Sequence, residues 1–177
     1  EMINTLQDDK ICEKMENADL KLDCYFMINP NKMSLSMCNT SIQSNQNERL
    51  DSCYVQVAQA KSDILICNQL KSETRKNECV ALVALYKLDI SVCDKIKDEN
   101  FSEYCKAVVG GKLLQESVCK NIINTYNRNV CYFWIARKKQ DPTMCLKIQE
   151  NPNYIYVDQF TKTNCLKEIA KYKNDES

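Results

Sequence analysis

The sequence has no histidine, and this absence removes several chemistries at once. Without imidazole there is no Ser-His-Asp or Cys-His catalysis and no histidine-containing zinc or haem site. The two glycines, Gly110 and Gly111, leave no P-loop and no dinucleotide-binding fingerprint, and so few glycines argue against a turn-rich β fold. Lys and Arg total 24, as do Asp and Glu, so no net charge favours nucleic acid or an anionic membrane surface.

Long apolar stretches are absent too. No run of 18 apolar residues occurs, so no membrane span is expected.

The chain begins with Glu1 and Met2, and we expect a mature form from which a signal peptide or a lipid-anchored segment has been lost. A chain of 177 residues is long enough for one domain with a substantial core.

What the sequence has in abundance is cysteine, with twelve residues at a nearly regular spacing. Two classes alternate: the first follows an aliphatic residue or Met, and the second usually stands five residues before a small residue. The step from a second cysteine to the next first cysteine is always 14 residues, and the whole unit is about 26 residues, a period typical of solenoids. We therefore expect a single helical-repeat domain over 1–177 with six units, at about 8–33, 34–62, 63–88, 89–114, 115–140 and 141–177.

Each unit predicts a hairpin with a short first helix and a longer second helix, of about 8 and 12–15 residues. Around the second cysteine, apolar residues recur at helical spacing with no breaker, as in 75–88. Four residues before a first cysteine stand favoured N-caps, Asp63, Asp89 and Asp141. Ser34 can take this place in the second unit. Gln115 breaks the pattern, so we expect the first helix of the fifth unit to start elsewhere, for instance at Ser117.

Pairing each first cysteine with the next second cysteine uses all twelve, whereas the opposite pairing leaves Cys12 and Cys165 alone. Helix geometry favours the same choice, because at about 1.5 Å per residue Cys67 and Cys79 end nearly level across their hairpin. From Cys79 to Cys93 the axial offset would be roughly 7 Å, which strains the Cα separation of a disulfide. The predicted pairs are Cys12–Cys24, Cys38–Cys53, Cys67–Cys79, Cys93–Cys105, Cys119–Cys131 and Cys145–Cys165.

Paired cysteines indicate an oxidising compartment, and we expect an extracellular or cell-surface protein without a cofactor. Two alternatives stay open. A metal site would normally carry a Cys-x-x-Cys motif, whereas the closest cysteines here are 12 residues apart. Unpaired thiols in the core of a cytosolic protein would leave the presence of one cysteine in every helix unexplained.

Two tripeptides match the sequon for N-glycosylation, at Asn39 and at Asn100. Such tripeptides also arise by chance in an Asn-rich chain. The densest aromatic run, Tyr132-Phe133-Trp134, lies in a predicted second helix, where we expect it to belong to the core.

The last unit departs most from the repeat, because 20 residues separate its two cysteines. Asn153 can cap a long final helix from Tyr154 toward Tyr172, and such a helix would cover the last core face of the repeat. A binding surface that uses Tyr154, Tyr156 and Phe160 is the alternative for this segment.

No catalytic constellation emerges from the sequence. The 24 acidic residues are scattered, and a reactive thiol would need a lone cysteine of low pKa, so we expect no enzymatic activity. We expect a structural building block of a surface or filamentous assembly, because repeat surfaces that stack head to tail form filaments. The alternative is a secreted or surface-anchored binding module for a protein or peptide, since solenoids offer elongated binding surfaces. The expected partner is thus the chain itself or another protein.

Short motifs recur over nearly the whole chain. Asp63 to Leu70 leads to Arg75 to Cys79, and Cys131-Tyr132 is followed by Ala136. These motifs resemble a cysteine-containing helical-hairpin repeat of about 26 residues in uncharacterised secreted or lipoprotein-like proteins of archaea and bacteria. Departures are Phe101 in place of Arg and Gly110 in place of Ala. The resemblance implies a cell-surface or extracellular setting and carries no catalytic residues.

Overall fold

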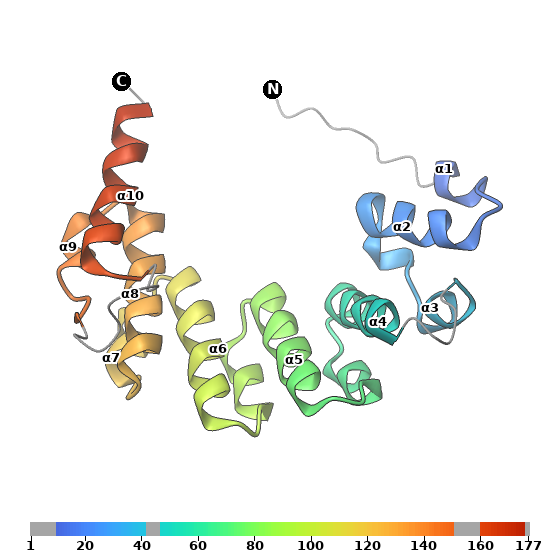
Figure 1. The fold of residues 1–177 in the computed structure, drawn as a ribbon, viewed down its shortest axis with the longest axis horizontal. Helices are drawn as coiled ribbons and strands as arrows, with labels where there is room; N and C mark the ends of the chain where they lie inside the picture. Colours follow the sequence, from blue (N-terminus) through green and yellow to red (C-terminus); the bar gives the residue numbers. More distant parts are fainter. Residues whose placement is uncertain (1–9, 42–46, 151–159, 176–177) are drawn as a thin grey trace. The chain divides into compact units, whose positions relative to one another are not determined.

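The computed structural model describes residues 10–41, 47–150 and 160–175, and within these ranges the chain is helical with no strand (Figure 1). The predicted all-α fold of disulfide-linked hairpins is confirmed. The chain forms two compact units, residues 1–86 and 87–177. None of the described helices is long and apolar enough to cross a membrane.

Unit 1 contains three hairpins. Its elements, with η for a 3₁₀-helix, are α1 (Lys10–Glu13), α2 (Ala18–Ile28), η1 (Pro30–Lys32), α3 (Leu35–Ser41), α4 (Asn47–Lys61), η2 (Ile64–Gln69) and α5 (Glu73–Lys87), whose last residue lies beyond the boundary. Unit 2 contains the other three hairpins. Its elements are η3 (Ile90–Lys95), α6 (Glu99–Lys112), α7 (Glu116–Asn121), α8 (Thr125–Lys139), α9 (Pro142–Cys145) and α10 (Lys162–Asp175).

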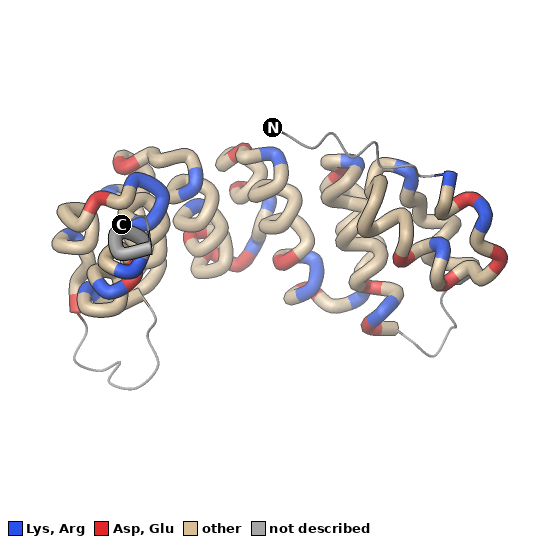
Figure 2. The backbone as a smooth tube through the Cα atoms, turned by 90° about the horizontal axis from the view of Figure 1, so that it is seen from above, with Lys and Arg blue, Asp and Glu red and all other residues tan. Residues whose placement is uncertain are grey.

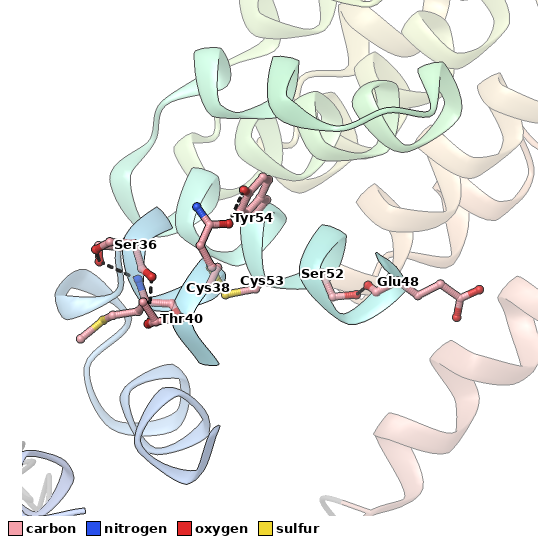
Figure 3. The surroundings of a disulfide bond; sticks show 10 residues. Ser36, Cys38, Thr40, Glu48, Ser52, Cys53 and Tyr54 are labelled. Atoms are coloured by element: carbon pink, nitrogen blue, oxygen red, sulfur yellow. Dashed lines mark hydrogen bonds between the residues drawn. A yellow bond between two sulfur atoms is a disulfide. The ribbon is translucent and has the colours of Figure 1, made fainter. Parts of the chain in front are cut away.

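All six predicted disulfides are present, each joining the short and the long helix of one hairpin. Their Cα atoms are 5.5–5.8 Å apart, as expected for cysteines that lie level across a hairpin. Figure 3 shows the pair formed by Cys38 of α3 and Cys53 of α4. Isolated helices as short as these are unstable in water. The disulfide stabilises each short helix by holding it against its long partner.

The N-caps of the short helices follow the prediction. Asp63, Asp89 and Asp141 each accept a hydrogen bond from the backbone N–H two residues later, at 2.9–3.0 Å. Ser34 caps α3 through the N–H of Met37. The prediction for the fifth unit was wrong: α7 begins at Glu116, not Ser117, with Gln115 in the cap position but without a side-chain hydrogen bond.

The short helices are shorter than the predicted eight residues. They have four to seven residues, and two of them, η2 and η3, are 3₁₀-helices. In four units the apolar residue three positions after the first cysteine is buried, and its N–H bonds to the carbonyl of that cysteine: Leu70, Ile96, Ile122 and Ile148. The chain turns inward to bury this side chain, and the turn ends the short helix.

A left-handed turn closes the long helices at a regular interval. Four residues spaced 26 apart have φ of 50–61°, namely Ser62, Leu88, Leu114 and Gln140. At Ser62 the N–H bonds to Gln59 O at 3.0 Å, and the next N–H, of Asp63, bonds to Ala58 O at 2.9 Å. This pattern is the Schellman motif, which usually has glycine at the left-handed position. A turn of this kind accompanies four of the five 14-residue steps between cysteines, whereas the step from Cys24 to Cys38 passes through Asn29, whose φ is −146°, and η1.

In unit 2 the long helices α6, α8 and α10 pack side by side in that order (Figure 1). The two glycines permit the close approach that the repeat predicts for small residues. A Cβ on Gly110 would lie 2.7 Å from Val118 Cγ1 of α7. A Cβ on Gly111 would lie 2.7 Å from Trp134 Cβ and 3.0 Å from the Cys131 oxygen of α8. Since real Cβ atoms essentially never approach another atom as closely as 2.7 Å, a side chain at either position would require a shift of its neighbours.

The final helix does not follow the prediction. Asn153, Tyr154 and Tyr156 lie outside the described residues, but α10 begins at Lys162, where the Thr161 hydroxyl accepts from the N–H of Asn164 at 3.1 Å. The prediction of a continuous helix from Tyr154 is therefore wrong. Phe160 lies instead in a turn and is buried in the core of unit 2, so burial of its ring takes precedence over helix continuation.

Candidate binding surface

Two pockets open beside Trp134 in unit 2. The pocket between α8 and α10 has a volume of about 410 Å³, and the pocket between α6 and α8 about 380 Å³. The first is lined from α8 by Phe133, Trp134 and Arg137, from α10 by Asn164, Lys167, Glu168 and Lys171, and by Phe160. The second is lined by Lys112, Trp134, Arg137 and Lys138. Because both share Trp134 and Arg137, we call them together the Trp134 surface.

The repeat brings these side chains together. Lys112 and Lys138 both stand seven residues after the second cysteine of their hairpin, and Arg137 and Lys171 both stand six residues after theirs. Equivalent positions of long helices packed side by side face the same way. Residues far apart in sequence therefore meet on one surface.

Trp134 is half-buried and lies between cations. The Lys112 Nζ is 5.3 Å from the centroid of the indole ring, and the Arg137 Cζ is 5.5 Å from it. Both are within the range of a cation–π interaction. Lys138 donates to the Lys112 carbonyl oxygen at 2.8 Å, which places an ammonium at the negative C-terminal end of α6. The ring is thus held in place from two helices.

The floor of the larger pocket is aromatic. The rings of Phe133 and Phe160 meet edge to face at 5.2 Å, and Phe160 also contacts Tyr126 at 5.7 Å. Phe133 meets Trp134 edge to face at 6.5 Å. Such contacts fix the rings relative to one another, so the pocket has a rigid apolar base beneath its charged rim.

The charges that line the Trp134 surface are unbalanced. Five are cationic, Lys112, Arg137, Lys138, Lys167 and Lys171, whereas Glu168 is the single acidic lining residue and pairs with Lys171 at 3.5 Å. Elsewhere Lys and Arg are interspersed with Asp and Glu, as Figure 2 shows, and the whole chain has equal numbers of both. The local excess of positive charge therefore combines the basic end of α8, Arg137-Lys138-Lys139, with lysines that the fold brings beside it from α6 and α10.

The carboxyl groups with shifted pKa values line neither pocket. Hydrogen bonds from Ser91 and Thr143 lower the pKa values of the helix-capping Asp89 and Asp141. Lys147, followed by Lys120, lowers the pKa of Glu116 through hydrogen bonds. A general acid needs a raised pKa. These shifts are therefore those of structural carboxylates, and no group of three Cys, Asp or Glu residues within the described ranges could hold a metal ion.

The sequence-predicted sites are dispersed. The exposed Asn39, next to Cys38 in sequence, accepts a hydrogen bond from the Tyr54 hydroxyl at 2.7 Å. Asn100 is exposed in the first turn of α6, in unit 2. Of the three aromatic residues predicted to bind, Tyr154 and Tyr156 lie outside the described residues, and Phe160 contributes its buried ring to the base of the pocket.

Sequence reasoning missed the Trp134 surface. It assigned the aromatic run to the core, which holds for the buried Tyr132 and Phe133, whereas Trp134 is half-buried and packs against the edge of that core. An alignment of the units by their second cysteines could have found the signal, because basic residues six or seven positions later occur in the last three units.

Comparisons of the chain with protein-family models, with curated proteins and with solved structures gave no match.

Proposed function

We propose that this chain is a secreted or surface-exposed, non-enzymatic α-solenoid that binds a protein or peptide partner through the Trp134 surface. The observation that carries the proposal is a pair of adjacent pockets around one tryptophan on packed long helices. Tryptophan and arginine are the residues most often found at the energetic centre of protein interfaces. The six disulfides fit an oxidising, extracellular setting.

A role as a structural building block has its own supporting observation. The small residue five positions after the second cysteine is fully buried at Ala58, Ala84 and Ala136. Ala170, at the equivalent position of α10, is exposed. A second copy that packs on α10 would bury it, and repeated contacts of this kind would form a filament.

Two measurements on the native disulfide-bonded protein separate these roles. Light scattering and negative-stain microscopy report assembly. A photo-crosslinker in place of Lys167, compared with one in place of the exposed Lys95 of η3, reports partner contact in native extracellular material. The binding module is supported if the protein is a monomer and forms a discrete adduct from position 167 but none from position 95. Filaments, or identical adducts at both positions, overturn it.

A further inference from the structure

The Trp134 surface combines three features that together specify a class of ligand. It has an excess of cations on its rim, an aromatic base, and two pockets on either side of one helix. Cations attract carboxylates, the rings accept an apolar side chain, and the two pockets provide separate places for side chains of one segment.

We infer that the Trp134 surface binds an extended acidic segment of a partner protein, one that carries carboxylates and at least one apolar or aromatic side chain. This inference rests on the proposed function, because it names the chemistry of the partner at the same site. The segment crosses α8, with carboxylates against Lys112 on one side and Lys167 and Lys171 on the other.

The geometry of a helical repeat suits an extended segment. Axes of packed helices are about 8–10 Å apart, so the grooves on either side of α8 are separated by a similar distance. An extended chain advances about 3.3 Å per residue and crosses this distance in about three residues. A short segment therefore reaches both pockets, with Trp134 and Arg137 beneath its middle.

Other anionic ligands fit the surface less well. Glu168 stands among the cations of the larger pocket and pairs with Lys171, which reduces the net positive charge there. A modest positive charge suits a few carboxylates better than a phosphate backbone of high charge density. Nucleic-acid binding also usually comes with a basic domain, whereas this chain has equal numbers of acidic and basic residues. A mixed acidic and apolar peptide can place its carboxylates beside the lysines and its apolar side chain beside the rings.

Trp134 is the single tryptophan of the chain, so its fluorescence reports directly on this surface. The probe is a short serine-based peptide with several glutamates and one phenylalanine, and its control has every glutamate replaced by glutamine. We expect saturable change in Trp134 emission with the acidic peptide, weaker binding as salt is raised, and at least tenfold weaker binding of the glutamine peptide.

The double variant Lys167→Glu, Lys171→Glu tests the location. We expect about tenfold weaker binding of a labelled acidic peptide, because both substitutions reverse charges that face its carboxylates. The matched control is Lys139→Glu, an exposed residue of α8 that lines neither pocket, and it should change binding less than twofold. Circular dichroism confirms that both variants fold.

Several outcomes would overturn the inference. These are equal binding of the acidic and glutamine peptides, equal loss in the Lys139 control, or tighter saturable binding of an oligonucleotide or of phosphatidylserine vesicles at the same site. Failure of the acidic peptide alone leaves the crosslinking and assembly results untouched, so it refutes the chemistry assigned to the partner and not the proposal of a binding module.

Discussion

Substitution of Gly111 by alanine tests the closeness of α6 and α8. The added Cβ would lie 2.7 Å from Trp134 Cβ and 3.0 Å from the backbone oxygen of Cys131, neither of which is the mobile end of a side chain. Overpacking of this kind costs about 1–3 kcal/mol. Alanine gains about 1 kcal/mol over glycine within a helix. Because the contact is so short, the strain lies toward the upper end, and we expect net destabilisation of about 1–2 kcal/mol.

The assay is thermal unfolding of the oxidised protein, followed by circular dichroism and by Trp134 emission. For a unit of this size the expected loss lowers the Tm of unit 2 by roughly 5–10 °C. Gly110→Ala is the matched control, because its Cβ would meet the Val118 side chain of α7 instead. Both variants should be less stable, but we expect only Gly111→Ala to shift the native emission of Trp134.

A variant Gly111→Ala that is as stable as the original protein, with unchanged Trp134 emission, would refute the reasoning. It would mean that α8 moves away from α6 at no cost, so that the tryptophan is not held in a fixed position. The same result would weaken the case for a preformed binding surface, because the position of Trp134 depends on this contact.

Three further predictions concern stability. Asn129→Ala should cost about 2 kcal/mol in chemical denaturation, because the buried Asn129 exchanges two hydrogen bonds with the backbone of Gln149 and the variant leaves both groups unpaired. Acid should lower the Tm as the pH falls below about 5, because the folded pKa values of Asp89, Asp141 and Glu116 are lowered. Their contribution to stability is complete above the unfolded pKa and is lost as the pH falls through the folded one. Asp141→Asn should show a smaller acid loss, and an equal loss would contradict this assignment. Reduction of the disulfides should unfold the chain at 25 °C. Each unit has three disulfide loops of 12–20 residues that contribute about 3 kcal/mol each, whereas the free energy of unfolding of a domain is typically about 5–15 kcal/mol. Native circular dichroism that persists after complete reduction would contradict this prediction.

Much of the hairpin could be predicted from sequence because its determinants are local. An aspartate such as Asp63 caps its helix through an N–H two residues away, and Cys67 pairs with a cysteine 12 residues later across one turn. Interactions of such short range depend little on the rest of the fold, so spacing and helix geometry were sufficient to predict them.

The failures lie where distant packing competes with local preference. The left-handed turn at Leu114 is not announced by a glycine in the sequence. A leucine occupies the position at an intrinsic cost of about 1–2 kcal/mol, and its side chain packs against the core of unit 2. The late start of α10 is another case, because Phe160 is buried in that core and lies outside the helix. Neither outcome follows from local preference alone.

The sequence by itself determined the helical hairpins and the six cysteine pairs, because each depends on residues within one hairpin. Only the tertiary structure decided where the surface chemistry lies. Lys112 and Lys138 are 26 residues apart and belong to a chain with no net charge, yet the packing of α6 against α8 places both beside Trp134. Charges that cancel along the sequence do not cancel on one face of a packed repeat.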